Sequence, residues 1–221
     1  MLSLFLLVIY LVLKFSGSKR AEKRYVRFIT SHWAQFTLFT VGIKISVSGK
    51  ENIPASHSGF VVISNHQGNF DIPVFVACLP FASGFVAKKE LMKLPFINSW
   101  MKAMYCLPID RDNARESREK LLERMRSTEL TPMFLFPEGT RSKGPKMGPF
   151  RTGTLKLLFN DRMDVLPVTI SGSYKCYEEK SNVRSADVKV IFHPILKTSA
   201  FQLDEFDKFN AKLRGIIAEP L

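Results

Sequence analysis

Cysteine is scarce in this sequence, and its arrangement excludes two kinds of protein. The 221 residues include three cysteines, Cys78, Cys106 and Cys176. They are odd in number, lie far apart and lack metal-ligand spacing, which argues against a disulfide-stabilised domain and against a cysteine metal site. We therefore expect three reduced thiols in the core of a body that faces the cytosol.

Two common sequence motifs are also missing. A Gly-x-Ser-x-Gly nucleophile elbow does not occur, and repeats, low-complexity tracts and long linkers are absent. The gap from Gly139 to Gly144 matches a nucleotide phosphate loop, but Pro145 stands where that loop needs lysine. The sequence thus gives no support for a serine acyl-enzyme or for a phosphate loop of the nucleotide-binding kind.

What the chain has in excess is positive charge. Lys and Arg total 32 against 20 Asp and Glu, a formal net charge of +12, which favours an anionic partner such as nucleic acid, a phosphorylated substrate or acidic lipid. The 46% apolar fraction and 19 Phe residues indicate a folded body rather than a basic disordered tail. An apolar N-terminus and the lack of a basic helix with base-stacking aromatics argue against nucleic acid.

The first 42 residues predict a two-helix membrane anchor. Residues 1–15 are almost wholly apolar, and a second apolar stretch over 25–41 repeats its large side chains at helical spacing. Fifteen helical residues reach about 22 Å, less than the ~30 Å of a hydrocarbon core, so we expect both helices to lie in one leaflet. Between them, a basic cluster is expected among anionic lipid headgroups: Lys19, Arg20, Lys23, Arg24 and Arg27.

Two other interpretations of residues 1–42 stay open. One is a helical hairpin packed on the core, and the other is a single transmembrane helix. A cleaved secretory signal is disfavoured, because the positive charge follows the apolar run instead of preceding it. The favoured location is the cytoplasmic face of the cell membrane, with the protein monotopic or peripheral.

Residues 43–221 predict one α/β domain, because short apolar runs alternate with helical periodicity. We expect a single mixed, largely parallel sheet flanked by helices. The predicted strands cover residues 43–48, 60–64, 85–87, 107–110, 133–136, 165–170 and 188–192. The predicted helices cover residues 71–78, 90–104, 114–127, 153–160 and 203–218.

The strand over 60–64 is followed by a histidine and a carboxylate, His66 and Asp71. On a continuous helix their side chains would point about 140° apart, so they meet only if the chain turns, and Gly68 and Asn69 are turn-forming residues. A carboxylate that orients the imidazole would let His66 deprotonate a hydroxyl without a protein nucleophile. The alternative is structural: Asp71 starts a helix, as Pro73 in its first turn indicates.

A second polar cluster follows the strand over 133–136. Glycine there allows close backbone approach, and an arginine side chain offers a planar fork that matches phosphate geometry. The alternative is an exposed basic turn. The cluster comprises Pro137, Glu138, Gly139, Thr140, Arg141 and Ser142, then Lys143, Lys146 and residues 150–153.

These segments together resemble the glycerophospholipid acyltransferase family, particularly 1-acylglycerol-3-phosphate acyltransferases. The resemblance rests on Asn65-His66 with Asp71 and, about seventy residues later, on the run from Phe136 to Ser142. Weaker agreement comes from residues 107–111, from residues 166–168 and from the run that begins at Lys88. The block over residues 107–111 departs from the family, because Tyr105 and Cys106 stand just before it where a glycine often stands.

The resemblance implies roles for particular residues. His66 would be the general base and Asp71 its orienting carboxylate, and Arg111 would be a supporting cation. The residues implied in acceptor binding are Glu138, Gly139, Thr140 and Arg141, with Lys88 as an addition. It also implies an acyl thioester of coenzyme A or acyl carrier protein as donor, lysophosphatidic acid as acceptor, and neither metal nor prosthetic group.

Rival interpretations concern the acceptor and the class of protein. The acceptor could instead be glycerol 3-phosphate or another lysophospholipid. A non-enzymatic protein of the membrane surface would use neither His66 nor Asp71. The apolar residues Leu91, Met92, Leu94, Phe96 and Trp100 suit an acyl groove, with core packing as the simpler expectation.

Overall fold

The computed structural model describes residues 2–56, 59–94, 97–109, 113–127 and 131–221. In this part of the chain, strands form at the apolar runs that the sequence indicates. They are β1 (Lys44–Ser48), β2 (Phe60–Ser64), β3 (Gly84–Lys88), β4 (Leu107–Ile109), β5 (Met133–Leu135), β6 (Asp164–Ser171) and β7 (Asp187–Phe192). Each lies within two residues of a predicted strand, although Asp110 of the predicted fourth strand is outside the described residues.

The strands form one seven-stranded sheet in the order β1-β7-β6-β2-β5-β3-β4. Neighbouring strands are parallel except for β6 and β7, which are antiparallel. All five residues of β2 are buried, as expected for a strand that is covered on both faces and therefore apolar throughout. The predicted single mixed, largely parallel sheet is confirmed.

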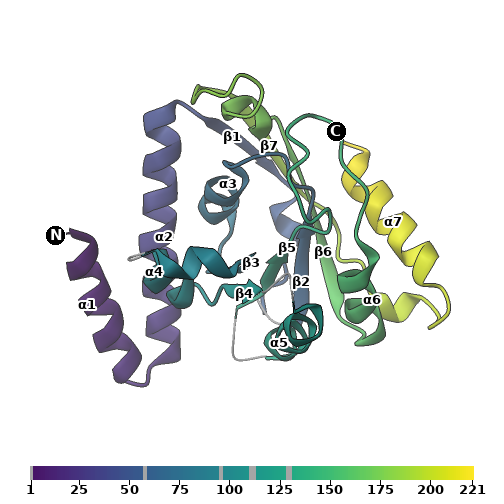
Figure 1. Ribbon diagram of the computed structural model, residues 1–221, viewed down its shortest axis with the longest axis horizontal. Coiled ribbons are helices and arrows are strands. Elements are labelled where there is room, and N and C mark those ends of the chain that lie inside the picture. Colours follow the sequence, from purple (N-terminus) through teal and green to yellow (C-terminus); the bar gives the residue numbers. More distant parts are fainter. Residues whose placement is uncertain (1, 57–58, 95–96, 110–112, 128–130) are drawn as a thin grey trace.

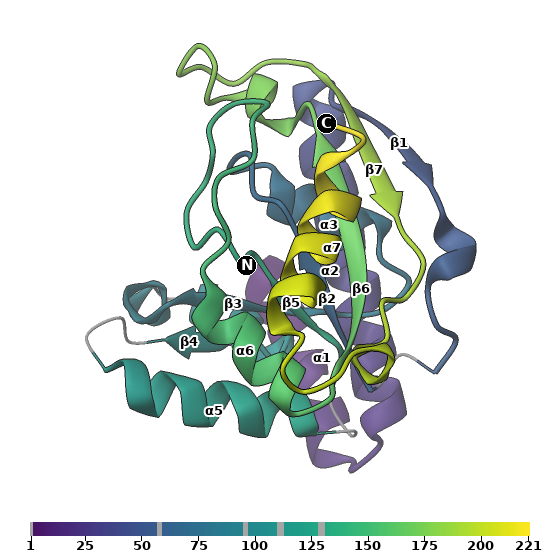
Figure 2. The ribbon, with the colours of Figure 1, turned by 90° about the vertical axis from the view of Figure 1, so that its right-hand side faces the viewer.

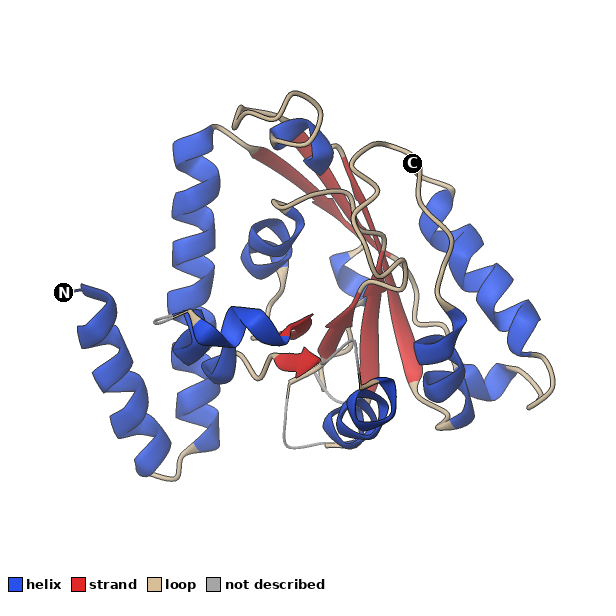
Figure 3. Cartoon of the chain, in the orientation of Figure 1, coloured by secondary structure: helices blue, strands red, loops and turns tan. Residues whose placement is uncertain are grey.

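Helices cover both faces of this sheet (Figures 1 and 3). Val62 of β2 belongs to the core on the side of α2 and α3, whereas its neighbour Ile63 belongs to the core under α5, α6 and α7. Figure 2 shows α7 lying along β6. The helices are α1 (Leu2–Phe15), α2 (Lys19–Val41), α3 (Asp71–Cys78), α4 (Ile97–Ala103), α5 (Ala114–Arg126), α6 (Thr152–Asn160) and α7 (Phe206–Ala218).

The N-terminal segment forms a helical hairpin, in which α2 lies between α1 and α3 (Figure 1). Ala34 and Leu38 of α2 join the buried core beside α3. The Tyr25 hydroxyl donates a hydrogen bond of 2.9 Å to the Leu6 carbonyl and ties α2 to α1. One side of the hairpin is therefore packed against the body, as one of the open interpretations states.

The basic cluster is not between the helices, so this part of the prediction is wrong. The Ser18 side chain accepts a bond from the Ala21 amide and caps α2, which begins at Lys19. All five basic residues thus lie on the first turns of α2, and burial lowers the pKa of Arg27. No helix within the described part of the chain is both long and apolar enough to cross a bilayer.

A single helix over residues 90–104 is also wrong. The structure has a 3₁₀ helix, η2 (Lys89–Lys93), followed by α4 from Ile97. Residues 95–96 are outside the described ranges, and the sequence places Pro95 there, which lacks the amide that a continuous helix needs. Leu91 and Leu94 are exposed, at 40% and 44%. The expectation that they pack in the core is therefore wrong for these two residues.

Candidate active site

The parallel strands of the sheet deliver polar residues to one edge. In a parallel sheet the carboxyl ends of the strands lie side by side, and loops that leave them can meet. His66 follows β2, Glu138 follows β5 and Ser173 follows β6. Both β5 and β6 pair with β2 in parallel, so these three residues leave the sheet at the same edge.

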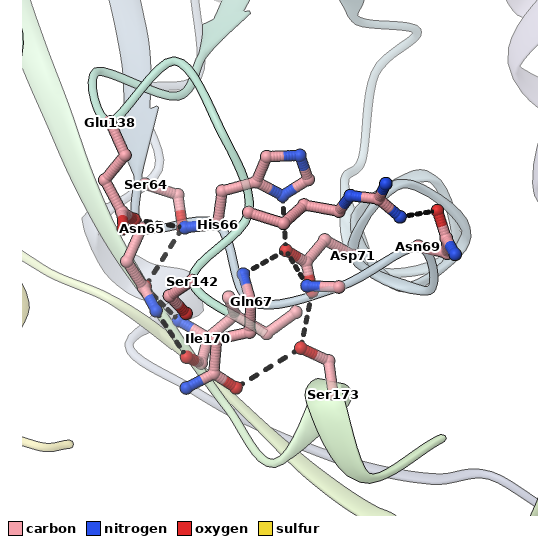
Figure 4. A network of polar contacts seen from close by, with 12 residues as sticks. Ser64, Asn65, His66, Gln67, Asn69, Asp71, Glu138, Ser142, Ile170 and Ser173 are labelled. Carbon is pink, nitrogen blue, oxygen red and sulfur yellow. Dashed lines mark hydrogen bonds and ion pairs between the residues drawn. The ribbon is translucent and has the colours of Figure 1, made fainter. Parts of the chain in front are cut away.

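The chain turns after β2 and brings His66 onto Asp71, as predicted. The His66 Nδ1 atom lies 2.6 Å from Asp71 Oδ2. The same carboxylate oxygen accepts bonds from the amides of Gln67, at 2.6 Å, and Gly68, at 3.1 Å (Figure 4). Asp71 is also the first residue of α3, so one fully buried carboxylate both holds the turn and contacts the imidazole.

These contacts fix the orientation of the His66 ring. An ionised carboxylate only accepts hydrogen bonds, so Nδ1 donates to Asp71 and Nε2 of the neutral ring is left as the acceptor. The ring stacks on Phe136, with 4.1 Å between ring centroids and 18° between planes. Nε2 points away from Asp71 (Figure 4), and no residue in the described part of the chain bonds to it. With 19% of the side chain exposed, this nitrogen is placed to take a proton.

Glu138 holds the loop after β5 against the turn from His66 to Asp71, which we call the catalytic turn after its predicted role. Its Oε1 accepts a 2.7 Å bond from the His66 amide, and its Oε2 accepts a 2.7 Å bond from the Gly148 amide. Burial raises the pKa of this carboxyl, against the opposing effect of the two amide donors. Both oxygens thus contact backbone, and a contact of Glu138 with an acceptor stays a prediction.

The same loop closes over the catalytic turn through its backbone. The Ser142 amide donates to the His66 carbonyl at 2.8 Å, and the Lys143 amide donates to the Gln67 carbonyl at 3.1 Å. Gly139 has a φ of +67°. Glycine suits this position because L side chains rarely adopt this left-handed backbone conformation.

Arg141 is the cation that the structure places beside the catalytic turn. Its Nη1 donates to the Asn69 side chain and, at 3.3 Å, to Glu178 Oε1. About a third of the side chain is exposed, so the guanidinium is accessible while its direction is set by Asn69 and Glu178. Thr140 beside it is exposed.

The two other predicted cations are less well placed by the structure. Lys88 is the last residue of β3, at the same edge of the sheet as His66, and its side chain is outside the described part. Arg111 lies outside the described residues altogether. Their proposed contacts with an acceptor stay predictions.

Three further residues contact the site. The sequence indicated Phe136 only as part of a motif, and it did not single out Ser173 or Glu178. Phe136 stacks on His66, the Ser173 hydroxyl donates to Asp71, and Glu178 contacts Asn69 and Arg141. The position of Ser173 just after β6 is the one signal that could have indicated it, because His66 and Glu138 follow parallel strands in the same way.

The three cysteines are free, as expected. Burial raises the pKa of all three thiols, to about 11 for Cys78 and Cys176. Thiols with such pKa values stay protonated near neutral pH and are poor nucleophiles. Among the described residues, no group of three or more His, Cys, Asp or Glu side chains is arranged to hold a metal ion.

Comparison with known proteins decides the family of this chain. The family model described as Acyltransferase matches residues 44–171, which include the catalytic turn, the loop after β5 and β6. The chain belongs to the acyltransferase family. The match covers every predicted site residue, since these run from His66 to Arg141.

Individual relatives within the acyltransferase family agree. A chloroplast 1-acyl-sn-glycerol-3-phosphate acyltransferase of Brassica napus is 31% identical over 185 residues, which cover 82% of this chain and 53% of that protein. A 1-acyl-sn-glycerol-3-phosphate acyltransferase of Borreliella burgdorferi is 30% identical over 193 residues, which cover 85% and 74%. The chain thus spans about half the length of the plant relative.

The fold has a counterpart among solved acyltransferases. The crystal structure of the 1-acyl-sn-glycerophosphate acyltransferase of Thermotoga maritima superposes with a TM-score of 0.77 at 23% identity. The match covers 99% of this chain and 94% of that one. The arrangement of helices around the mixed sheet is therefore shared over nearly the whole length of both chains.

The contacts of Glu138 predict a loss of stability on substitution. In Glu138→Gln the side-chain NH₂ group would face one of the two backbone amides, leaving a buried donor without an acceptor. We expect the free energy of unfolding to fall by about 1–3 kcal/mol, measured by urea denaturation. Glu123→Gln, at an exposed position of α5, is the matched control, and equal stability of both variants would show that Glu138 does not hold these amides.

Proposed function

We propose that this chain transfers a fatty acyl group from an acyl thioester to the 2-hydroxyl of 1-acylglycerol 3-phosphate, forming phosphatidic acid. The observation that carries the proposal is the 2.6 Å contact between His66 Nδ1 and Asp71 Oδ2. It leaves Nε2 free to accept a proton beside an accessible arginine. Family membership and the activity for which the Brassica napus and Borreliella burgdorferi relatives are named support this reaction.

The reaction is a direct transfer in which His66 is the general base. Nε2 takes the proton of the acceptor hydroxyl while that oxygen attacks the thioester carbonyl. A new C–O bond forms, the C–S bond breaks, and the proton passes from His66 to the departing thiolate. Asp71 stabilises the imidazolium that exists between these two proton transfers. The raised pKa values of the cysteine thiols support a route without an acyl-enzyme.

The acceptor phosphate would be bound by Arg141. A guanidinium can donate two parallel bonds to phosphate oxygens, and Nη1 is the only nitrogen of this guanidinium with a bond recorded in the described part of the chain. Fixing the phosphate would bring the acceptor hydroxyl to His66. Glu138, Gly139, Thr140, Lys88 and Arg111 complete the proposed acceptor site.

Substitution of His66 tests the proposal. His66→Ala should lower acyl transfer by about 10²–10⁴-fold, because a positioned general base contributes a factor of that order. The assay supplies lysophosphatidic acid or glycerol 3-phosphate with acyl-coenzyme A or acyl-acyl carrier protein, and follows phosphatidic acid by mass spectrometry. Circular dichroism and liposome binding should be unchanged.

The outcomes of this assay separate the rival interpretations. Unchanged transfer in His66→Ala would contradict the proposed base. Transfer to glycerol 3-phosphate alone would show that this compound, and not lysophosphatidic acid, is the acceptor. A wild-type chain that binds liposomes and transfers no acyl group to either acceptor would favour the non-enzymatic membrane protein.

We also propose that the α1–α2 hairpin lies on the membrane surface, at the cytoplasmic face. Large apolar side chains on its outer side are exposed although the hairpin packs on the body. On α2 the exposed fractions are 55% for Trp33, 67% for Phe36 and 80% for Phe39. The basic first turns of α2 would meet anionic headgroups. This supports an anchor over residues 1–42 and a catalytic domain over 43–221.

Removing the exposed apolar side chains tests the anchor. The triple variant Trp33→Ser, Phe36→Ser and Phe39→Ser should bind vesicles containing phosphatidylglycerol at least about tenfold more weakly in a flotation assay, because it loses apolar surface that would enter the lipid. Leu203→Ser removes an apolar side chain of 65% exposure just before α7 and is the control. Equal binding by the triple variant would contradict the anchor.

A further inference from the structure

The chain just after β6 contacts the catalytic turn and lies beyond the residues that the family model matches. That match ends at residue 171. Gly172, the 3₁₀ helix η3 (Ser173–Cys176) and Glu178 follow directly. We call residues 172–178 the bracing segment. It contacts both Asp71, the partner of His66, and Arg141.

Gly172 allows the bracing segment to turn back toward the site. Its φ is +95°, and a Cβ there would lie 2.5 Å from the Asp187 carbonyl oxygen. Its amide donates a 2.9 Å bond to the Gln67 side chain, in the catalytic turn. The turn places Ser173 directly beside Asp71.

Ser173 completes the set of donors around the carboxylate of Asp71. Its Oγ lies 2.5 Å from Asp71 Oδ1, whereas Oδ2 is occupied by His66, Gln67 and Gly68. Ser173 and Asp71 are both fully buried. Because each oxygen of the carboxylate has its own donors, the side chain of Asp71 has a single orientation (Figure 4).

Glu178 connects the catalytic turn to Arg141. Its Oε1 accepts a 2.7 Å bond from the Asn69 amide and lies 3.3 Å from Arg141 Nη1, and only 3% of the side chain is exposed. A Cβ at Gly68 would lie 2.4 Å from Glu178 Oε2. Gly68 thus gives Glu178 the space to approach the turn.

We propose that Ser173 and Glu178 are positioning residues, Ser173 for the His66–Asp71 pair and Glu178 for Arg141. The bracing segment would thereby fix the position of His66 relative to Arg141, although these two residues come from different loops. The inference rests on the proposed function for its kinetic tests. Substitution of the two residues should have different kinetic effects, because Ser173 acts on the His66–Asp71 pair and Glu178 acts on Arg141.

The pH–rate profile tests Ser173. Its hydroxyl disperses the negative charge of Asp71, so without it that charge acts more fully on the imidazolium and the protonated ring is favoured. In Ser173→Ala the acid limb of kcat/KM should move to higher pH by about half a unit and the plateau should fall about tenfold. The titratable groups that interact with Asp71 are His66, Glu138 and Cys176, and the Arg141–Glu178 ion pair lies beside the same turn. All of these groups remain in the variant.

The control for Ser173 is another buried serine. Ser83→Ala removes a hydroxyl that donates a 3.0 Å bond to the Pro132 carbonyl, and it should leave the acid limb in place. Ser173→Cys keeps a weak donor of similar size and should fall between alanine and wild type. An acid limb that does not move in Ser173→Ala would overturn the role of Ser173.

Michaelis constants test Glu178. Glutamine at this position keeps an oxygen for the Asn69 amide and removes the charge that orients Arg141. In Glu178→Gln the KM for lysophosphatidic acid should rise about tenfold, with kcat within about twofold. Glu179→Gln, one residue further along and paired with Arg184, is the control. An unchanged or lower KM in Glu178→Gln would overturn the role of Glu178.

Hydrogen exchange separates a failure of this inference from a failure of the proposed function. The amides of Gln67 and Gly68 bond to Asp71, so they should exchange at least about tenfold faster in Ser173→Ala than in wild type or Ser83→Ala. This measurement needs no turnover. Unchanged exchange would overturn the positioning by Ser173 even in an active enzyme, whereas faster exchange in a chain without acyl transfer would support it and refute the function alone.

Discussion

The hydrogen bond between His66 and Asp71 is the interaction on which the rest of the site depends. It joins two residues five positions apart in a turn, and it places a carboxyl group in a fully buried position. Burial of a charge is costly unless hydrogen bonds replace water. The amides of Gln67 and Gly68 and the Ser173 hydroxyl supply these bonds. The turn and the His66–Asp71 pair therefore stabilise each other.

The sheet explains why the other residues are available at this place. Because β2, β5 and β6 are parallel, the loop with Glu138 and the bracing segment with Ser173 leave the sheet beside the catalytic turn. Glu138 fixes the backbone of His66, and Ser173 fixes its carboxylate partner. The proposed chemistry thus depends on three strands that are far apart in sequence and adjacent in the sheet.

Much of this arrangement could be predicted from local patterns. The run from Phe60 to Ser64 is apolar throughout, which is typical of a strand buried on both faces, and the structure has β2 over the same residues. The turn residues Gly68 and Asn69 indicated that His66 and Asp71 could meet. A sequence pattern over a few residues was sufficient there, because the contact itself is local.

Contacts over long sequence separations could not be predicted in this way. Ser173 lies 102 residues from Asp71, and nothing in its neighbourhood marks it as different from any serine after a strand. The sequence favoured an acceptor contact for Glu138, whereas both of its oxygens bond to backbone amides. The start of α2 was missed because charged side chains on a helix face carry no apolar periodicity.

The role of His66 as general base can be tested by a structure of the chain with lysophosphatidic acid and an unreactive thioether analogue of the acyl donor. We expect the acceptor 2-hydroxyl to lie about 2.6–3.2 Å from His66 Nε2, with Nδ1 still bonded to Asp71 and the phosphate bound to Arg141. An acceptor hydroxyl bound away from Nε2, or a complex in which His66 and Asp71 have separated, would contradict it.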